Sequence, residues 1–315
     1  MKNTAIVASS TAIIKGRKQK YMYFRKSWRF HLMLLPAVLA ALVFNYAPLP
    51  GIVMAFQNFK PWLGFAQSEW VGWDNFQMVF TMKDSIQVLW NTLLISCLKI
   101  IFGLAVPVAF ALMLNEIRQI GLKRSIQTMV YLPHFMSWVI LGGILLDVLS
   151  LQGIVNQALT FFQVEPIMFL GDGDWFRITV IVSDLWKEFG FSAIVFLAAL
   201  SGINPEYYEA SEIDGAGRWK QTLYITLPSM LPIMAVVFTL SLGNVLNANF
   251  DQIYNLINPL VLQQGDIIDT FVFRNFKGGQ YSLAAAVGLF KSLVSFILIS
   301  GGYYCAYRWT NYRVF

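Results

Sequence analysis

The sequence predicts an all-α membrane protein that crosses a bilayer six times and keeps both termini on the cytoplasmic side. Of its 315 residues 57% are apolar and 13% are charged, against about 45–50% and about 25% in soluble globular chains. The apolar residues form six long runs, and a bilayer crossing needs about 20 helical residues. The basic residues are spread unevenly over the segments between those runs. No linker or polar block indicates a separate soluble domain.

Residues 1–30 form a basic N-terminal segment that holds eight lysines and arginines and no acid. The apolar run that follows, 31–55, is long and contains Pro36 and Pro48. A secretory signal would instead have a short apolar stretch and a cleavage site of small residues. We therefore expect an uncleaved first span. The basic segment is an orientation signal or also contacts anionic lipid headgroups.

Five further spans follow in the sequence. They are expected at 88–113, 126–149, 178–201, 229–249 and 282–306. The six spans make a single transmembrane domain over 31–306, and residues 307–315 form a short tail.

The distribution of positive charge orients these spans. In a six-span chain, segments 114–125 and 202–228 and the C-terminal tail lie on the same side as 1–30, and together they add seven basic residues. The connections on the other side hold five. Because basic loops are retained in the cytoplasm, both termini and the loop 202–228 are expected inside.

The loop 202–228 predicts two short helices at the membrane surface, joined by a glycine turn. Pro205 suits a first helical turn, where its missing N–H is no loss. Gly215 and Gly217 supply the left-handed or tight geometry that ends a helix. Pro228 is expected to end the second helix before the fifth span. Such a stiff element could move as a body and carry the adjoining spans with it.

The residues of this loop resemble the coupling loop of binding-protein-dependent ABC importer permeases. The family pattern is Glu-Ala-Ala, three residues, Gly, nine residues, and then Ile-x-Leu-Pro. This chain is similar at every spacing, with serine in place of the second alanine, at Glu209, Ala210, Ser211, Gly215, Ile225, Leu227 and Pro228.

Shorter motifs extend the resemblance over most of the chain. Tyr46-Ala47-Pro48, Trp70-Val71-Gly72 and Asn91-Thr92-Leu93 look like carbohydrate permeases, and the run LPHFMSWV at 132–139 resembles the lipoprotein/polysaccharide-type branch. The resemblance implies the type I ABC importer permease fold of the maltose-transporter-like subunits, in a bacterial inner membrane.

The resemblance also implies a function and a set of partners. The chain would form half of the translocation pathway of an importer for oligosaccharides or polysaccharide-derived sugars, working by alternating access. Its partners would be a second homologous permease, a homodimeric or heterodimeric ABC ATPase that binds ATP and magnesium, an extracytoplasmic sugar-binding protein and the lipid bilayer, with no nucleic acid. By position, Glu209 and Asp214 would meet the ATPase, Gly215 would make the turn, and the small side chains would pack closely: Ala210, Ser211 and Ala216.

The chain itself is expected to be neither an enzyme nor a cofactor protein. It contains no glycine-rich phosphate loop ending in Gly-Lys-Ser/Thr, so ATP hydrolysis must belong to a separate subunit. It also lacks a cluster of His, Cys and carboxylate residues typical of a catalytic metal.

Charged residues inside the spans predict either a polar lining or ion pairs within the bundle. Lys99 lies in the second span, Lys187 and Glu188 in the fourth, and Lys291 in the sixth. Asp184 and Lys187 are spaced to pair on one helix, whereas the neighbours Lys187 and Glu188 point about 100° apart. As a lining, the three lysines would favour an acidic sugar such as a uronate oligosaccharide.

The outer end of the fifth span carries amides and aromatic rings, the groups that sugar recognition requires. The candidates are Asn244, Asn247, Asn249, Phe250, Asp251 and Tyr254. The alternative is that the asparagines bond neighbouring helices. His134 predicts a buried, hydrogen-bonded histidine or, alternatively, a pH-sensing one.

Two other classes of protein compete with the importer subunit. A secondary solute transporter working alone would show an internal repeat and helices broken in mid-membrane, and the sequence shows neither. An intramembrane enzyme would need a nucleophile and a base facing one another within the spans. Neither alternative explains the loop 202–228.

Overall fold

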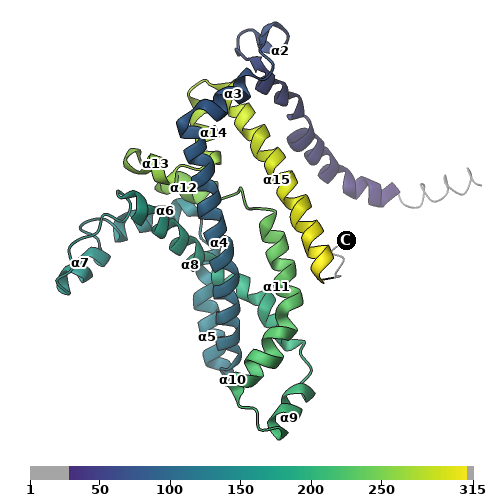
Figure 1. Ribbon diagram of the computed structural model, residues 1–315, viewed down its shortest axis with the longest axis vertical. Coiled ribbons are helices and arrows are strands. Elements are labelled where there is room, and N and C mark those ends of the chain that lie inside the picture. Colours follow the sequence, from purple (N-terminus) through teal and green to yellow (C-terminus); the bar gives the residue numbers. More distant parts are fainter. Residues whose placement is uncertain (1–27, 311–315) are drawn as a thin grey trace, which may run out of the picture. The chain divides into compact units, whose positions relative to one another are not determined.

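The computed structural model describes residues 28–310, and in 302, 303 and 305–310 only the helical backbone (Figure 1). Most of the basic segment 1–30 and most of the tail 307–315 therefore lie outside the described residues. The chain divides into two units, and the boundary in the sequence lies between Val53 and Met54. Within the described residues its regular secondary structure is helical, apart from one antiparallel pair of two-residue strands, β1 (Gln57–Asn58) and β2 (Glu69–Trp70).

The first unit contains the helix predicted as the first span. Residues 28–41 are α-helical. The chain then continues through a π-helical turn, η1 (Leu42–Tyr46), into the 3₁₀-helix η2 (Leu49–Phe56). Together Trp28–Phe56 are long and apolar enough to cross a membrane.

The second unit is built around the long helix α4 (Lys83–Asn115), against which α8 (Gly173–Ser201) packs. In Figure 1 α4 is one long helix, with α9 beyond its end. The remaining helices, in chain order, are α2 (Gly64–Gln67), α3 (Asp74–Thr81), α5 (Ile120–Tyr131), η3 (Leu132–Phe135), α6 (Trp138–Val148), α7 (Ile154–Phe161), α9 (Glu206–Ile213), α10 (Arg218–Gln221), η4 (Thr222–Thr226), α11 (Leu227–Leu242), α12 (Phe250–Leu256), η5 (Pro259–Val261), α13 (Leu262–Gly265), α14 (Ile268–Lys277) and α15 (Tyr281–Thr310).

The described chain has four helices long and apolar enough to span a membrane, or five if one bent pair counts as a span. The four are Trp28–Phe56, Lys83–Asn115, Arg218–Leu242 and Tyr281–Gly301. They coincide with the first, second, fifth and sixth predicted spans. The predicted number of six is therefore not confirmed by length and composition, and the third and fourth spans account for the difference.

The expected third span, 126–149, is broken rather than straight. Ile120–Phe135 and Trp138–Val148 meet at 102°. The break lies where Met136 and Ser137 adopt extended backbone, and Ser137 Oγ accepts a hydrogen bond from the Ile140 N–H as the cap of α6. An apolar run does not show such a cap, because hydropathy is insensitive to local backbone bonding.

The expected fourth span, 178–201, lies within α8. Its 29 residues correspond to about 43 Å at 1.5 Å per residue, enough to cross a bilayer. Asp184, Lys187 and Glu188 fall close together in this helix, and they keep it outside the apolar class. Length therefore supports a crossing, and composition opposes one.

Pro228 does not end a helix, so that expectation is wrong. Arg218–Leu242 is one continuous helical run. Just before the proline the helix widens into the π-helical turn η4, in which the Leu227 N–H donates to the Thr222 carbonyl. Pro228 then occupies the first turn of α11, directly after this widened turn.

The fifth span also ends earlier than the expected 229–249. α11 stops at Leu242, and the chain turns before α12 begins at Phe250. Asn249 adopts a left-handed backbone (φ 72°), and its side chain accepts a hydrogen bond from the Gln252 N–H. Asparagine tolerates this conformation better than most residues, so a turn replaces the last two helical turns of the predicted span.

The packing of α8 depends on a glycine at its closest approach to α5. A Cβ atom on Gly190 would lie 2.6 Å from the Val130 carbonyl oxygen and 2.4 Å from Val130 Cγ1. Small residues allow helices in membranes to approach this closely. In contrast, a Cβ atom on Gly143 of α6 would meet nothing within 4 Å.

The substitution Gly190→Ala is expected to destabilise the protein by about 1–3 kcal/mol, because the methyl group overpacks the α5–α8 contact. The measurement is the thermal unfolding midpoint of the purified protein in detergent. The matched control Gly143→Ala adds the same methyl group in open space and is expected to keep the wild-type midpoint. Equal midpoints for the two variants would contradict the close approach.

Candidate functional site

The helix α4 carries polar groups at three levels. Lys83 begins it, Lys99 lies halfway along it, and Glu116 follows its last residue. At 1.5 Å per residue, each interval is about 25 Å. A cavity lies beside Lys99, and the loop 202–228 contacts Glu116.

The cavity beside Lys99 has a volume of about 610 Å³. Its walls come from α4, α8, the end of α11 and the turn before α12. The lining residues are Ser96, Lys99, Ile100, Gly103, Asp184, Glu188, Ser241, Asn244, Asn247, Asn249, Phe250 and Asp251. Polar side chains from separate parts of the sequence thus meet in one space.

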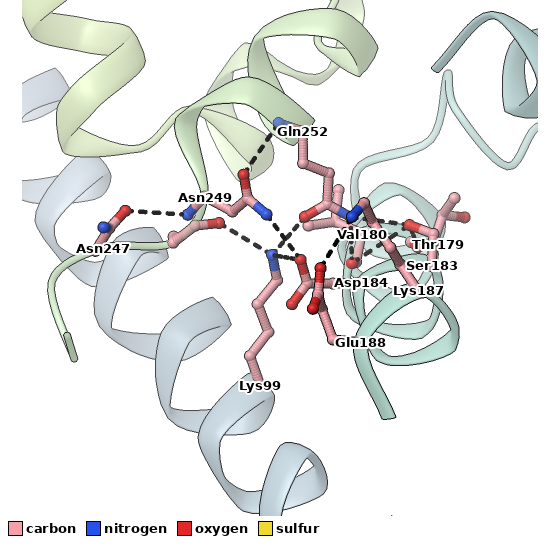
Figure 2. Close-up of polar contacts among 11 residues, drawn as sticks. Lys99, Thr179, Val180, Ser183, Asp184, Lys187, Glu188, Asn247, Asn249 and Gln252 are labelled. Atoms are coloured by element: carbon pink, nitrogen blue, oxygen red, sulfur yellow. Dashed lines mark hydrogen bonds and ion pairs between the residues drawn. The ribbon is translucent and has the colours of Figure 1, made fainter. Parts of the chain in front are cut away.

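Lys99 is the centre of a hydrogen-bonded network that joins three segments (Figure 2). Its Nζ lies 3.3 Å from Asp184 Oδ1 and donates to the Ala248 carbonyl at 3.0 Å. Asn249 Nδ2 donates to the same Asp184 oxygen at 3.0 Å. The side chains of Lys99 and Asp184 are only 10% and 18% exposed, so the pair is largely shielded from solvent.

Gln252 completes this network, and we did not predict it from the sequence. It is fully buried, and its amide nitrogen donates to the Val180 carbonyl at 2.7 Å and to Ser183 Oγ at 2.9 Å. These two bonds fix the amide so that its oxygen accepts a hydrogen bond from Lys99 Nζ. One signal was present: Gln252 lies three residues after Asn249, on the same helical face.

Lys187 and Glu188 form a second cluster beside the cavity. Lys187 Nζ lies 3.0 Å from Glu188 Oε1 and donates to the His134 carbonyl at 2.7 Å. His134 Nδ1 is 2.7 Å from Glu188 Oε2, and its ring stacks on Phe191 at 3.9 Å. His134 is therefore hydrogen-bonded, as one of the two interpretations had it, although its side chain keeps 28% of its exposure.

The expected pairing of Asp184 with Lys187 is wrong. Asp184 pairs with Lys99 of α4, and Lys187 pairs with its own neighbour Glu188. The long stem of a lysine spans the 100° between adjacent helical positions. The cation from α4 already occupies Asp184, which leaves Glu188 as the carboxylate within reach of Lys187.

The structure brings most of the predicted pathway residues together in the cavity. Those that line it are Lys99, Glu188, Asn244, Asn247, Asn249, Phe250 and Asp251. Three others lie outside its lining. Lys187 is buried beside it, Tyr254 stacks on Phe250 with ring centres 5.2 Å apart, and Lys291 Nζ lies 2.5 Å from Asp269 Oδ1.

These pairings remove the reason for expecting an acidic sugar from the number of lysines in the spans. Lys99, Lys187 and Lys291 each have a carboxylate within 3.3 Å. None of the three is an uncompensated cation, so their number does not by itself favour an acidic ligand.

The loop 202–228 is a compact helix–turn–helix braced by its own side chains. Gly215 takes the left-handed conformation (φ 75°) after α9, and the Ala216 N–H donates back to the Ser211 carbonyl at 2.9 Å. Ser211 Oγ accepts from Gln221 Nε2 at 3.0 Å and donates to the Tyr208 carbonyl at 2.8 Å. Serine at this position thus supplies a bond between the two arms that alanine could not make.

The outer face of this loop is exposed and partly apolar. Glu209, Ala210, Asp214, Gly215 and Pro228 are exposed, whereas Ser211, Ala216, Ile225 and Leu227 are half-buried. Ile213 and Trp219 keep 89% and 80% of their exposure. Arg218 joins the loop to the end of α4 by an ion pair of 2.9 Å with Glu116. Large apolar side chains presented by a braced loop are typical of a protein-binding surface.

Among the described residues, no three His, Cys, Asp or Glu side chains are grouped so that they could hold a metal ion.

Residues 100–306 match the family of binding-protein-dependent transport system inner membrane components, and the chain belongs to this family. The match covers α8, the loop 202–228 and the cavity lining apart from Ser96 and Lys99. The resemblance drawn from the spacing of Glu209, Gly215 and Pro228 is thereby confirmed, and so is the class of the protein, a membrane permease component of a transporter.

Two relatives and one solved structure are similar to this chain over about nine tenths of its length. The chain is 41% identical to Protein LplB of Bacillus subtilis, over 92% of each chain. It is 40% identical to the polygalacturonan/rhamnogalacturonan transport system permease protein YteP of Bacillus subtilis, over 91% of this chain and 88% of the relative. Among solved structures, a bacterial ABC transporter involved in the import of the acidic polysaccharide alginate matches with a TM-score of 0.85 and 36% identity, over 93% of this chain and 99% of that one.

Breaking the shielded ion pair is expected to be costly and reversible by a second change. Lys99→Met leaves the Asp184 carboxylate without its cation and should cost about 3–5 kcal/mol. Lys99→Met combined with Asp184→Asn should recover part of that loss. The measurement is a double-mutant cycle of unfolding midpoints in detergent.

The matched control is the exposed pair Arg218–Glu116, whose side chains are 62% and 54% exposed. Exposed pairs contribute about 0–1 kcal/mol, so the cycle of Arg218→Gln and Glu116→Gln should show little coupling. Additive losses at Lys99 and Asp184 would show that the network does not hold the three segments together.

Proposed function

We propose that this chain is one of the two permease subunits of an ABC importer for oligosaccharides derived from polysaccharides. In this proposal it crosses a bacterial inner membrane six times, with 1–30, the loop 202–228 and 307–315 in the cytoplasm and 31–306 as the permease domain. The observation that carries the proposal is the braced, exposed loop 202–228 in a chain of this family.

The charges of α8 are compatible with a fourth crossing. Asp184 is bonded to Lys99 and Asn249, and Lys187 is bonded to Glu188 and the His134 carbonyl. Charged side chains inside membranes are stable when they pair within the bundle or face a cavity. The bent pair Ile120–Phe135 and Trp138–Val148 would supply the third crossing.

The loop is mechanically connected to the cavity on both sides. Upstream, α8 runs from Asp184 and Glu188 in the cavity wall to Ser201, just before the loop. Downstream, Arg218–Leu242 is one helical run that ends two residues before Asn244. A displacement of the loop would thus be transmitted along two helices to the walls of the cavity, as alternating access requires.

The work would be divided among partners. A separate ATPase would bind ATP and magnesium and grip the loop through Glu209, Asp214 and the exposed Ile213 and Trp219. Each movement would open the cavity to one side in turn. A second permease would complete the pathway, and a binding protein outside the membrane would deliver the sugar. One solved neighbour is the alginate transporter in complex with an alginate pentasaccharide-bound periplasmic protein.

The cavity suits sugar hydroxyl groups. Asn244, Asn247 and Asn249 offer amide donors and acceptors. Phe250, stacked on Tyr254, offers an aromatic face for the C–H surface of a sugar ring.

Acidic sugars are the specific substrate class we propose. Two similar proteins are transporters of acidic polymers, polygalacturonan in one and alginate in the other. The lysines of the spans do not support this choice, because each has a carboxylate partner.

Distorting the loop 202–228 is expected to reduce uptake strongly without unfolding the chain. Gly215→Val forces a β-branched residue into a left-handed backbone, so the loop should lose its shape, its hold on the ATPase and at least about tenfold in uptake rate. Glu209→Lys should weaken ATPase attachment by reversing a charge on the exposed face. The measurements are co-purification of the ATPase and oligosaccharide uptake by cells.

The control is Gly217→Ala, because Gly217 has a negative φ of −72° and open space around its Cα. It should retain attachment and uptake. Unchanged attachment in the Gly215→Val variant would refute the coupling role, and uptake in cells that lack the ATPase would favour a secondary transporter.

The substrate class is tested with one oligosaccharide in two charge states. Cells that express the wild-type complex are expected to take up trigalacturonate and to take up its uncharged methyl ester much more slowly. Radiolabelled uptake measures both, with a neutral trisaccharide of galactose as the reference. Equal uptake of all three sugars would remove the acidic assignment and leave the permease role intact.

A further inference from the structure

Two adjoining hollows lie outside the lining of the central cavity, and the first of them reaches Lys83 at the start of α4. The first has a volume of about 630 Å³ and is lined by Lys83, Asp84 and Gln87 together with the segment 259–266. The second, of about 370 Å³, is lined by Tyr254, Phe273 and Lys277 among others. They share Pro259, Leu262, Asp266 and Arg274, so they meet at one wall.

That shared wall is a rigid ion pair. Arg274 Nη2 lies 2.6 Å from Asp266 Oδ2, and Thr270 Oγ1 donates to Asp266 Oδ1 at 2.6 Å. The Asp266 side chain is 2% exposed, whereas that of Arg274 is 47% exposed. Burial raises the pKa of the Asp266 carboxyl, although its bonds to Thr270 and Arg274 oppose the rise. Arg274 therefore positions the wall and is not a free cation.

The loop that closes the hollows is fastened to two long helices. Asn91 Nδ2 of α4 donates to the carbonyls of Gln263 and Asp266 at 3.0 and 3.1 Å. Arg177 of α8 donates to the Gln264 carbonyl at 2.9 Å and to Asn91 Oδ1 at 2.8 Å. A site whose walls are held in this way is formed before any ligand arrives.

Two exposed lysines in these hollows lack a carboxylate partner among residues 28–310. Lys83 forms no ion pair within these residues, and Lys277 Nζ lies 5.4 Å from the centre of the Phe273 ring, a cation–π contact. Asp84 is the one acid of these linings outside the Arg274 pair. In the central cavity the balance is reversed, because three acids, Asp184, Glu188 and Asp251, line it with one lysine, Lys99.

Aromatic rings lead from the second hollow to the central cavity. The ring of Phe273 meets Tyr254 edge-on at 5.2 Å and Phe250 at 5.4 Å. Phe250 lines the central cavity, so the three rings join the two spaces. Free cations beside aromatic faces are the combination that fits a sugar bearing a carboxylate.

We propose that these two hollows form an outer vestibule that binds a carboxylate-bearing sugar unit before it reaches the central cavity, with Lys83 and Lys277 as the residues that select for charge. The central cavity then recognises hydroxyl groups and ring faces and discriminates little by charge. This inference rests on the proposed import of acidic oligosaccharides, and it adds the site at which the carboxylate of the sugar is recognised.

The test uses the complete transporter in cells, with trigalacturonate and its methyl ester as probes. The double variant Lys83→Gln, Lys277→Gln should raise the KM for trigalacturonate about 5- to 10-fold, with the maximal rate unchanged. The KM for the ester should stay at the wild-type value. Raising the salt concentration should weaken wild-type uptake of trigalacturonate by screening, and the variant should lose most of this salt dependence.

The matched control is Lys60→Gln, since Lys60 is an exposed lysine that lines neither hollow. It should behave as wild type with both probes. If wild-type cells prefer trigalacturonate and the double variant keeps the wild-type KM and salt dependence, the vestibule is refuted and the importer stands. If wild-type cells show no preference for trigalacturonate, the acidic substrate class and the vestibule fail together.

Discussion

The ion pair between Lys99 and Asp184 is the interaction on which the arrangement of the second unit depends. It joins the middle of α4 to the middle of α8, and through Ala248, Asn249 and Gln252 it also fixes the turn between α11 and α12. Two largely shielded charges are stable only when their remaining hydrogen-bonding groups are satisfied. Here backbone carbonyls and buried amides satisfy them, so the cavity wall and the packing of the long helices are consequences of the same bonds.

The features that follow from local sequence patterns were predictable. The spacing of Glu209, Gly215 and Pro228 identified the family, and the left-handed glycine turn at Gly215 is present. The asparagines after α11 line the cavity, and Asn249 also bonds Asp184 of α8, so each of the two interpretations matches one observation. These predictions succeed because residue type and short-range spacing determine turns, caps and the polarity of a helix end.

The features that depend on long-range contacts were not predictable. Asp184 could be assigned to Lys187 by helical spacing, but its partner comes from α4, 85 residues earlier in the chain. The bend at Met136 and Ser137 is invisible in an apolar run, and Gln252 becomes part of the site only when α8 lies beside it. Lys83 and Lys277 lie far apart in the sequence, so the sequence alone could not show that they border adjoining hollows.

The π-helical turn η4 also has a geometric effect on the parts of the chain beyond it. A π-turn accommodates one residue more than the corresponding α-helical turn, and one residue corresponds to a rotation of about 100° about the helix axis. The direction in which Ser241 and Asn244 face is therefore determined some twenty residues earlier, beside the loop. Converting η4 into a regular α-helical turn would rotate the far end of α11 without altering any residue of the cavity. The π-helical turn thus sets the rotation of the cavity end of α11 relative to the loop.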